Sequence, residues 1–200
     1  MTFGLNYVDV RSRFDQEYEA VYQFGKQSAG QSAPRNDIGA YMLAARLKYK
    51  FDAARNPFLG VGFDWLSGDD DEDDSDAATF NTLFATNHKF YGFMDYFLNI
   101  PVSTSNLGLV DVIVSGGFDL HDKVNVQGAW HYFVTPVANQ KGNSFLGNEL
   151  DLTLRYAYRQ NLGVQAGFSL FFPGDIPKQS QDNDNLGIWF YTQMTYNFNN

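Results

Sequence analysis

Long stretches of this sequence alternate strictly between apolar and polar residues. The clearest stretch runs from Glu149 to Arg159, where three leucines and two tyrosines alternate mostly with charged or hydroxyl-bearing residues. Similar patterns occupy residues 41–51 and 124–134. Successive side chains of a β-strand point to opposite faces, so a period of two predicts strands with one apolar and one polar face. Helical spacing fits none of these windows, and the fold class expected is all-β.

Nine strands are expected, and most are about 11 to 14 residues long. Strands of soluble proteins average ~5–6 residues, whereas a tilted strand needs ~9–11 to cross the hydrocarbon core of a membrane. The lengths therefore favour an antiparallel transmembrane β-barrel, or part of one, over a soluble β-sandwich. The count becomes ten if His88–Phe97 adds a strand, and eight if the first segment is not one. The nine ranges are 2–12, 15–26, 38–51, 57–67, 108–120, 123–134, 147–159, 161–172 and 187–198.

Composition agrees with a surface that faces something other than water. Aromatic residues make up 17% of the chain, and charged residues 18%, below the ~25% usual in soluble domains. The chain has no cysteine, which excludes disulfide scaffolds, thiolate zinc sites and cysteine nucleophiles. No apolar stretch approaches the ~18 residues of a transmembrane helix.

The negative charge is concentrated in one segment. The net charge is −9, and seven of the acidic residues lie between Asp69 and Asp76, so the rest of the chain is nearly balanced. A nucleic-acid binder needs a basic face that neutralises phosphates, and this charge argues against such a partner.

The connections between the expected strands alternate between short turns and long loops, of which 68–107 is the longest. Outer-membrane barrels have short periplasmic turns and long extracellular loops, so the acidic run is expected outside the cell. Such barrels have even strand numbers, and the first residues lack the basic and apolar regions of a signal peptide. We therefore expect residues 1–200 to be a single barrel domain without its upstream strands and signal peptide.

Five segments resemble the C-terminal half of the alginate-export family of outer-membrane porins, in the order found in that family. They are EAVYQFG (Glu19–Gly25), GFDWLSGDD (Gly62–Asp70), HKFYGFMD (His88–Asp95), GNELDL (Gly147–Leu152) and FFPGD (Phe171–Asp175). Members of that family are longer than this chain, and Asn199 and Asn200 follow Phe198 where an aromatic residue usually closes the last strand.

The resemblance implies an integral protein of the outer membrane of the Gram-negative cell envelope. Its function would be export or passive diffusion of an anionic, uronate-type polysaccharide or related anions. Its partners would be the lipid bilayer, that polysaccharide and export proteins of the periplasm. The competing interpretation is an outer-membrane structural or adhesion barrel that acts through its extracellular loops without transport.

Charged residues on the polar strand faces are the candidates for a substrate pathway in the lumen. Arginine and lysine attract anions in a pore, and the arginine fork matches a sugar carboxylate. The alternative role of each residue is an ion pair with a neighbouring strand. Three of the cations share one strand that carries no acid of its own. The candidates are Arg46, Lys48, Lys50, Lys123, Arg155, Arg159, Glu149 and Asp151.

The long loop suggests two further features. Its acidic run offers carboxylate oxygens, the ligands that Ca²⁺ prefers, from Asp69, Asp70, Asp71, Asp73 and Asp74, although it lacks the spacing of a calcium loop. The alternative is a solvated loop without a ligand. The aromatic stretch 80–97 is expected to pack against the rest of the protein and to narrow the lumen.

Catalysis is not expected. The three histidines, His88, His121 and His131, are scattered without metal-ligand spacing. A Ser/His/Asp hydrolase of the outer-membrane phospholipase kind is the enzymatic alternative, but no serine lies in a nucleophile elbow. No cofactor other than the calcium at the acidic run is expected.

Overall fold

The computed structural model describes residues 1–28, 35–71, 74–83, 85, 90–177 and 184–198. Within these residues nine long strands form one sheet, and every neighbouring pair is antiparallel. The strands are β1 (Thr2–Val10), β2 (Phe14–Ser28), β3 (Arg35–Lys50), β4 (Phe58–Leu66), β6 (Leu109–His121), β7 (Val124–Val134), β8 (Phe145–Arg159), β9 (Leu162–Pro173) and β10 (Gly187–Tyr196).

These strands confirm the nine expected ranges to within a few residues, including the first segment. The described part of His88–Phe97 contains no strand. Two short elements were not predicted, the strand β5 (Asp76–Ala77), which pairs in parallel with β3, and the helix α1 (Ile100–Ser103). In the part of the chain that the structure describes, no helix is long and apolar enough to cross a membrane.

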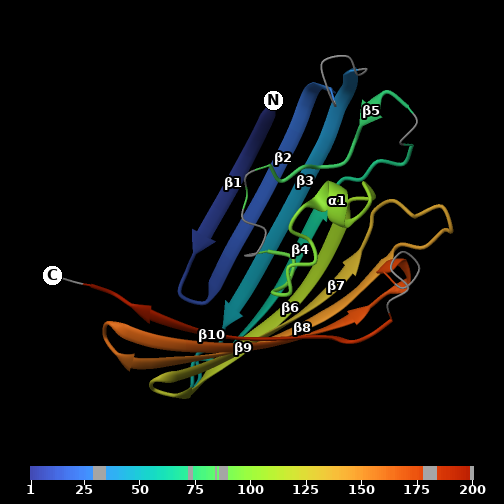
Figure 1. Ribbon diagram of the computed structural model, residues 1–200. Helices are drawn as coiled ribbons and strands as arrows, with labels where there is room; N and C mark the ends of the chain where they lie inside the picture. The colour runs from blue at the N-terminus through green and yellow to red at the C-terminus, as the bar shows by residue number, and fades with distance from the viewer. Residues whose placement is uncertain (29–34, 72–73, 84, 86–89, 178–183, 199–200) are drawn as a thin grey trace.

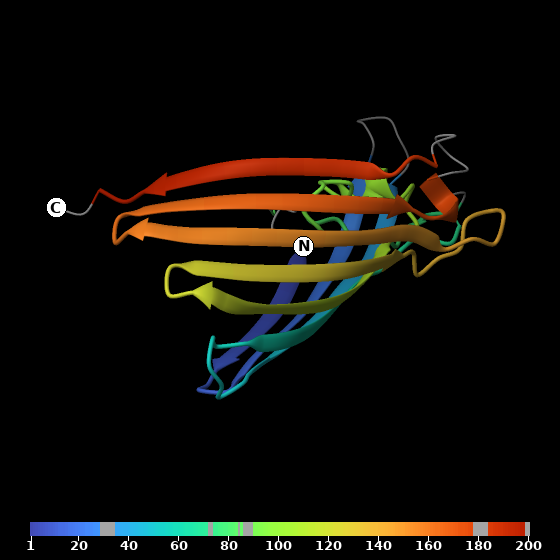
Figure 2. The same ribbon diagram turned by 90° about the horizontal axis from the view of Figure 1, so that it is seen from below.

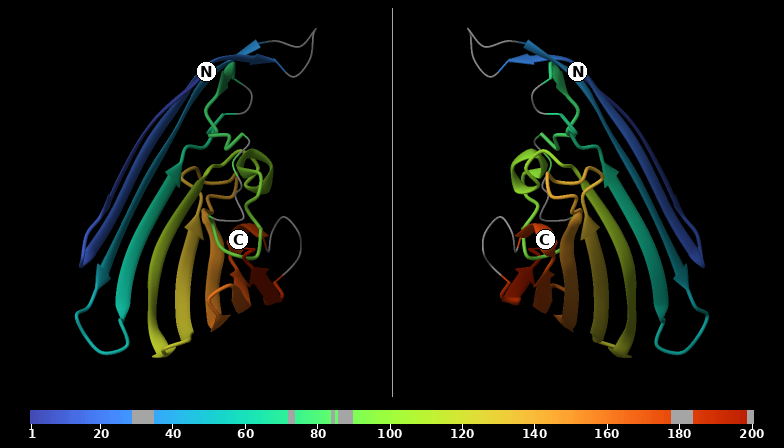
Figure 3. Two further views of the ribbon diagram at one scale, coloured as in Figure 1. Left: turned by 90° about the vertical axis from the view of Figure 1, so that its left-hand side faces the viewer. Right: turned by 90° about the vertical axis from the view of Figure 1, so that its right-hand side faces the viewer.

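The sheet is strongly bent, and it has a concave and a convex face. Tight turns join the strands at one end, and the long connections lie at the other end (Figures 1 and 2). The described residues of the connection between β4 and β6 (67–108), which include α1, lie on the concave side, as both views of Figure 3 show. We call these described residues the inner loop. In this structure the sheet is open, since β1 pairs with β2 and β10 with β9, but neither pairs with the other.

The hydrophobic core lies between the inner loop and the concave face. From the loop, Phe80, Tyr91, Phe97 and Ile100 are buried against residues of the strands. The convex face is apolar, unlike the surface of a soluble protein. Large apolar side chains lie exposed along it, among them Leu43, Leu47, Val114, Leu152, Leu154 and Phe190. A sheet with this apolar outer band matches the wall of a membrane barrel, whose outward residues face lipid.

Candidate functional site

The strand β3 presents three cations to the concave face. Its buried residues Ala40, Met42 and Ala44 alternate with exposed apolar ones, and the same parity continues through Arg46, Lys48 and Lys50. We call these three residues the basic ladder. They are spaced two residues apart, so their side chains follow one another along a single strand on its inner side.

Each rung of the ladder has a partner from a neighbouring strand. Nη2 of Arg46 donates to both carboxylate oxygens of Asp64 on β4, over 2.8 and 2.7 Å. Nζ of Lys50 donates to Asp15 on β2 over 2.7 Å. Nζ of Lys48 lies 4.9 Å from the ring centre of Phe58. The expected range 38–51 holds no acid, and the one acid of β3, Asp37, pairs with Lys26 on β2. The partners of the ladder come from the adjacent strands instead.

Two cavities follow the ladder along the concave face. The first, of about 690 Å³, lies toward the tight turns and is lined by Lys48, Lys50 and Phe58 among others. The second, of about 400 Å³, lies under the inner loop and is lined by Arg46 and Tyr91 among others. Arg46 also faces the ring of Phe90, whose centre lies 5.4 Å from the guanidinium carbon. The ladder thus borders successive spaces, in which cations and aromatic rings occur together.

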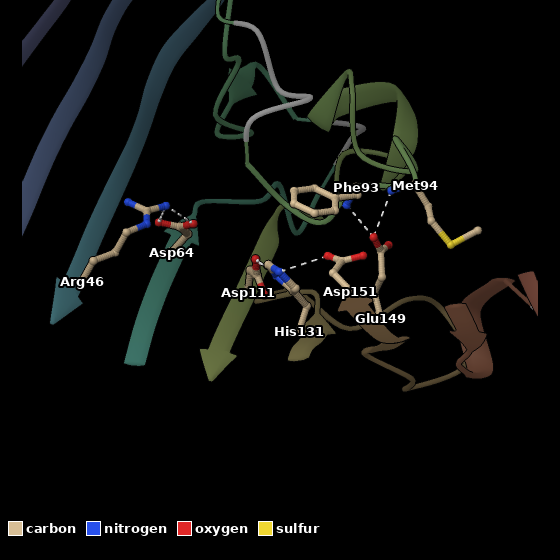
Figure 4. Close-up of polar contacts among 8 residues, drawn as sticks. All are labelled: Arg46, Asp64, Phe93, Met94, Asp111, His131, Glu149 and Asp151. Carbon is tan, nitrogen blue, oxygen red and sulfur yellow. Dashed lines mark hydrogen bonds and ion pairs between the residues drawn. The ribbon is translucent and has the colours of Figure 1, made fainter. Parts of the chain in front are cut away.

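A row of buried polar residues crosses the sheet at the level of Arg46 (Figure 4). Asp64 on β4 pairs in register with Asp111 on β6. Nδ1 of His131 on β7 lies 2.8 Å from Asp111, and its Nε2 lies 3.6 Å from Asp151 on β8. The row continues to Glu149, also on β8. Hydrogen bonds and ion pairs hold these groups, as expected for polar side chains taken out of water.

Two candidates, Glu149 and Asp151, belong to this row and accept hydrogen bonds from different segments. Asp151 accepts a hydrogen bond of 2.5 Å from Oγ of Ser169. Oε1 of Glu149 accepts hydrogen bonds from the backbone N–H groups of Phe93 and Met94, over 2.5 and 2.9 Å. Glu149 therefore contacts the inner loop rather than the basic ladder.

The remaining cations lie toward the tight-turn end of the sheet. Lys123 is in the turn between β6 and β7, and Arg159 is the last residue of β8, with its guanidinium 5.3 Å from the Tyr158 ring. Nε of Arg155 donates to Gln165 over 2.8 Å. The structure does not bring these three residues together with Arg46, which differs from the single set of lumen residues suggested by the sequence.

Side chains of the acidic run accept hydrogen bonds from backbone N–H groups of the same loop. Asp69 accepts hydrogen bonds from the backbone N–H groups of Asp71 and Ala78, and Asp74 accepts one from Asp76. Asp70 is exposed, and Asp73 lies outside the described residues. Among the described residues, no group of three His, Cys, Asp or Glu side chains is arranged to hold a metal ion. Calcium binding by this run stays a prediction.

Sequence reasoning missed His131 as a member of the site. The alternation of β7 predicted that the His131 side chain lies on the polar face. Its neighbours Asp111 and Asp151 come from β6 and β8, and only the register of the three strands places them beside it. Of the other two histidines, His121 ends β6 and His88 lies outside the described residues. In the inner loop, burial raises the pKa of the Tyr91 hydroxyl, and the nearby Asp64 carboxylate adds to the rise, so Tyr91 is neutral beside Arg46.

Comparisons with known proteins agree with this geometry. The family model described as "Alginate export" matches residues 1–189. The crystal structure of OccAB4 from Acinetobacter baumannii matches with a TM-score of 0.54 and 16% identity, over 96% of this chain and 45% of that chain. A NanC porin structure matches with a TM-score of 0.47 and 7% identity, over 98% of this chain and 93% of that chain. No curated protein matches the sequence. The chain therefore spans less than half the length of the OccAB4 chain, whose fold it shares over that part.

Proposed function

Since this chain belongs to the alginate export family, as an integral β-barrel protein of the outer membrane, we propose that it lines a channel for an anionic, uronate-type polysaccharide. The observation that carries the proposal is the basic ladder of Arg46, Lys48 and Lys50, which borders two successive cavities on the concave face. A carboxylated sugar chain moving along this face would meet a cation at every second residue from Arg46 to Lys50.

The partners of the ladder suit conduction rather than tight binding. A pore must attract its substrate enough for entry and release it again. Asp64 and Asp15 hold Arg46 and Lys50 in place and offset part of their charge. The rings of Phe90 and Phe58 lie against Arg46 and Lys48, and they offer apolar faces to the sugar rings. The transport we propose is passive and involves no catalytic step.

Planar-bilayer recording of the purified full-length protein under a salt gradient tests the proposal. We expect the wild type to prefer anions, and Arg46→Gln with Lys48→Gln to lose most of that preference, because both changes remove charge from the concave face. Lys141→Gln is the matched control, since Lys141 is an exposed residue of the connection between β7 and β8. It should leave the selectivity unchanged.

Two outcomes would contradict the proposal. One is a wild-type channel without anion preference, and the other is an unchanged preference in the double variant. Either would favour the competing role of a structural or adhesion barrel that acts through its loops. A soluble polyuronate added to one side should also reduce the current through the wild type more than through the double variant.

A further inference from the structure

The inner loop is fastened to the concave face at two widely separated points. On β2, Nε2 of Gln23 donates to the backbone carbonyl of Asn81 over 2.7 Å, and its Oε1 accepts from the Asn81 N–H over 3.0 Å. On β8, Glu149 accepts from the N–H groups of Phe93 and Met94. Four strands, β3, β4, β6 and β7, lie between β2 and β8 in the sheet. The described part of the loop is therefore attached to strands on both sides of the concave face.

Glu149 is buried and packs closely against the backbone of the loop. The residue is fully buried, at 0% exposure. Gly92, directly before the two N–H groups, has φ +83°. A Cβ atom on Gly92 would lie 2.6 Å from the carboxylate carbon of Glu149, well inside van der Waals contact. Glycine at this position thus allows both the backbone conformation and the close approach of the carboxylate.

Aromatic packing continues from this contact along the segment 92–97. The ring of Tyr96 stacks on Phe171 of β9 with 4.2 Å between centres, and Phe97 lies 4.7 Å from Phe133 of β7. These contacts lie on both sides of β8, the strand that carries Glu149. The carboxylate is therefore the polar centre of an otherwise apolar attachment.

We infer that Glu149 is a positioning residue that holds the segment 90–97 against the wall and thereby sets the width of the path along the concave face. The statement about width rests on the proposed function, whereas the statement about attachment does not. The acceptor oxygen matters here, not the net charge, because Oε1 alone receives both N–H groups of the loop. Glutamine keeps such an oxygen and should replace Glu149, whereas alanine should not.

Amide hydrogen exchange of the purified protein in detergent micelles tests the attachment. We expect Glu149→Ala to speed exchange at Phe93 and Met94 about tenfold, because both amides lose their buried acceptor oxygen. Glu149→Gln should retain slow exchange. Glu17→Ala is the matched control, because Glu17 is an inward glutamate of β2 that makes no hydrogen bond with the described part of the loop. It should leave the exchange at Phe93 and Met94 unchanged.

A second variant covers the case in which Glu149→Ala does not fold. Gly92→Ala leaves the wall intact and pushes against the carboxylate, so it should raise exchange at the same two amides. Wild-type exchange rates in the folded variants would overturn the attachment.

Single-channel conductance of the full-length protein then tests the width. Glu149→Ala should conduct more than the wild type and keep its anion preference, because the basic ladder is untouched, and Glu149→Gln should conduct like the wild type. Faster exchange with unchanged conductance would overturn the inference that Glu149 sets the width. A wild-type protein that conducts nothing would overturn the proposed function and the width with it, while the exchange data decide the attachment separately.

Discussion

Arg46 and Asp64 show how the protein keeps charge on its inner face. Asp64 is almost fully buried, at 2% side-chain exposure, while Arg46 keeps 27% and reaches the cavity. Removing one member of a buried pair leaves an uncompensated charge, which costs more than the pair itself contributes. Asp64 thus positions Arg46, and Arg46 makes the burial of Asp64 tolerable.

A double-mutant cycle on this pair should show strong coupling. We expect Arg46→Gln alone to lower the free energy of unfolding by about 3 kcal/mol, because it leaves Asp64 buried without its partner. Adding Asp64→Asn should recover part of that loss, since the amide is neutral. Urea unfolding in lipid vesicles, followed by tryptophan fluorescence, measures all four proteins. Strictly additive effects would mean that the pair contributes nothing specific.

The two faces of the strand β8 differ in burial: apolar side chains are exposed on one face, and polar side chains are buried on the other. On β8, Leu150, Leu152 and Leu154 are exposed on the convex face, while Glu149, Asp151 and Thr153 between them are buried. This reverses the pattern of a soluble sheet, in which the apolar side is buried. This distribution is expected when lipid surrounds the convex face and the inner loop covers the polar concave face.

Arginine substitutions on the two faces should lower the free energy of unfolding by different amounts. Leu152→Arg should lower the free energy of unfolding by about 2–4 kcal/mol, the cost of a cation on the lipid face near the bilayer midplane. Gln127→Arg is the matched control, because Gln127 lines the larger cavity on the concave face. It should cost much less. Equal costs in the same unfolding assay would argue against a lipid-facing convex surface.

At the scale of the whole molecule, the inner loop and the open sheet edges stand out. Eight successive antiparallel pairings lead from β1 to β10, so these two edge strands run in the same direction. Joining them directly would need a parallel seam in an otherwise antiparallel wall. The inner loop supplies the core that such an open sheet would otherwise lack, since it buries residues from six strands.

Gel mobility reports whether the 200 residues close into a barrel by themselves. A closed barrel resists detergent until it is heated, and it then changes its mobility. Because the edges are unpaired in this structure, we expect these residues alone to migrate in the same way before and after heating. A heat-dependent shift would show that β1 and β10 pair with each other after all.

The alternation and the lengths of the strands were enough to predict the fold class, the nine strands and the face on which most strand residues lie. These properties follow from the backbone, whose side chains alternate with a period of two regardless of what surrounds the strand. The sequence therefore predicted that Arg46, Lys48 and Lys50 lie together and that Glu149 and Asp151 point inward.

Partners across strands were decided only by the tertiary structure. The register of β4, β6, β7 and β8 brings Asp64, Asp111, His131 and Asp151 into one row, and no local pattern encodes that register. The path of the inner loop is likewise a matter of long-range contacts, since Glu149 meets an N–H group 56 residues earlier in the chain. The residues from which a channel could be built are thus visible in the sequence, whereas their pairing, and the loop held across them, depend on contacts between distant segments.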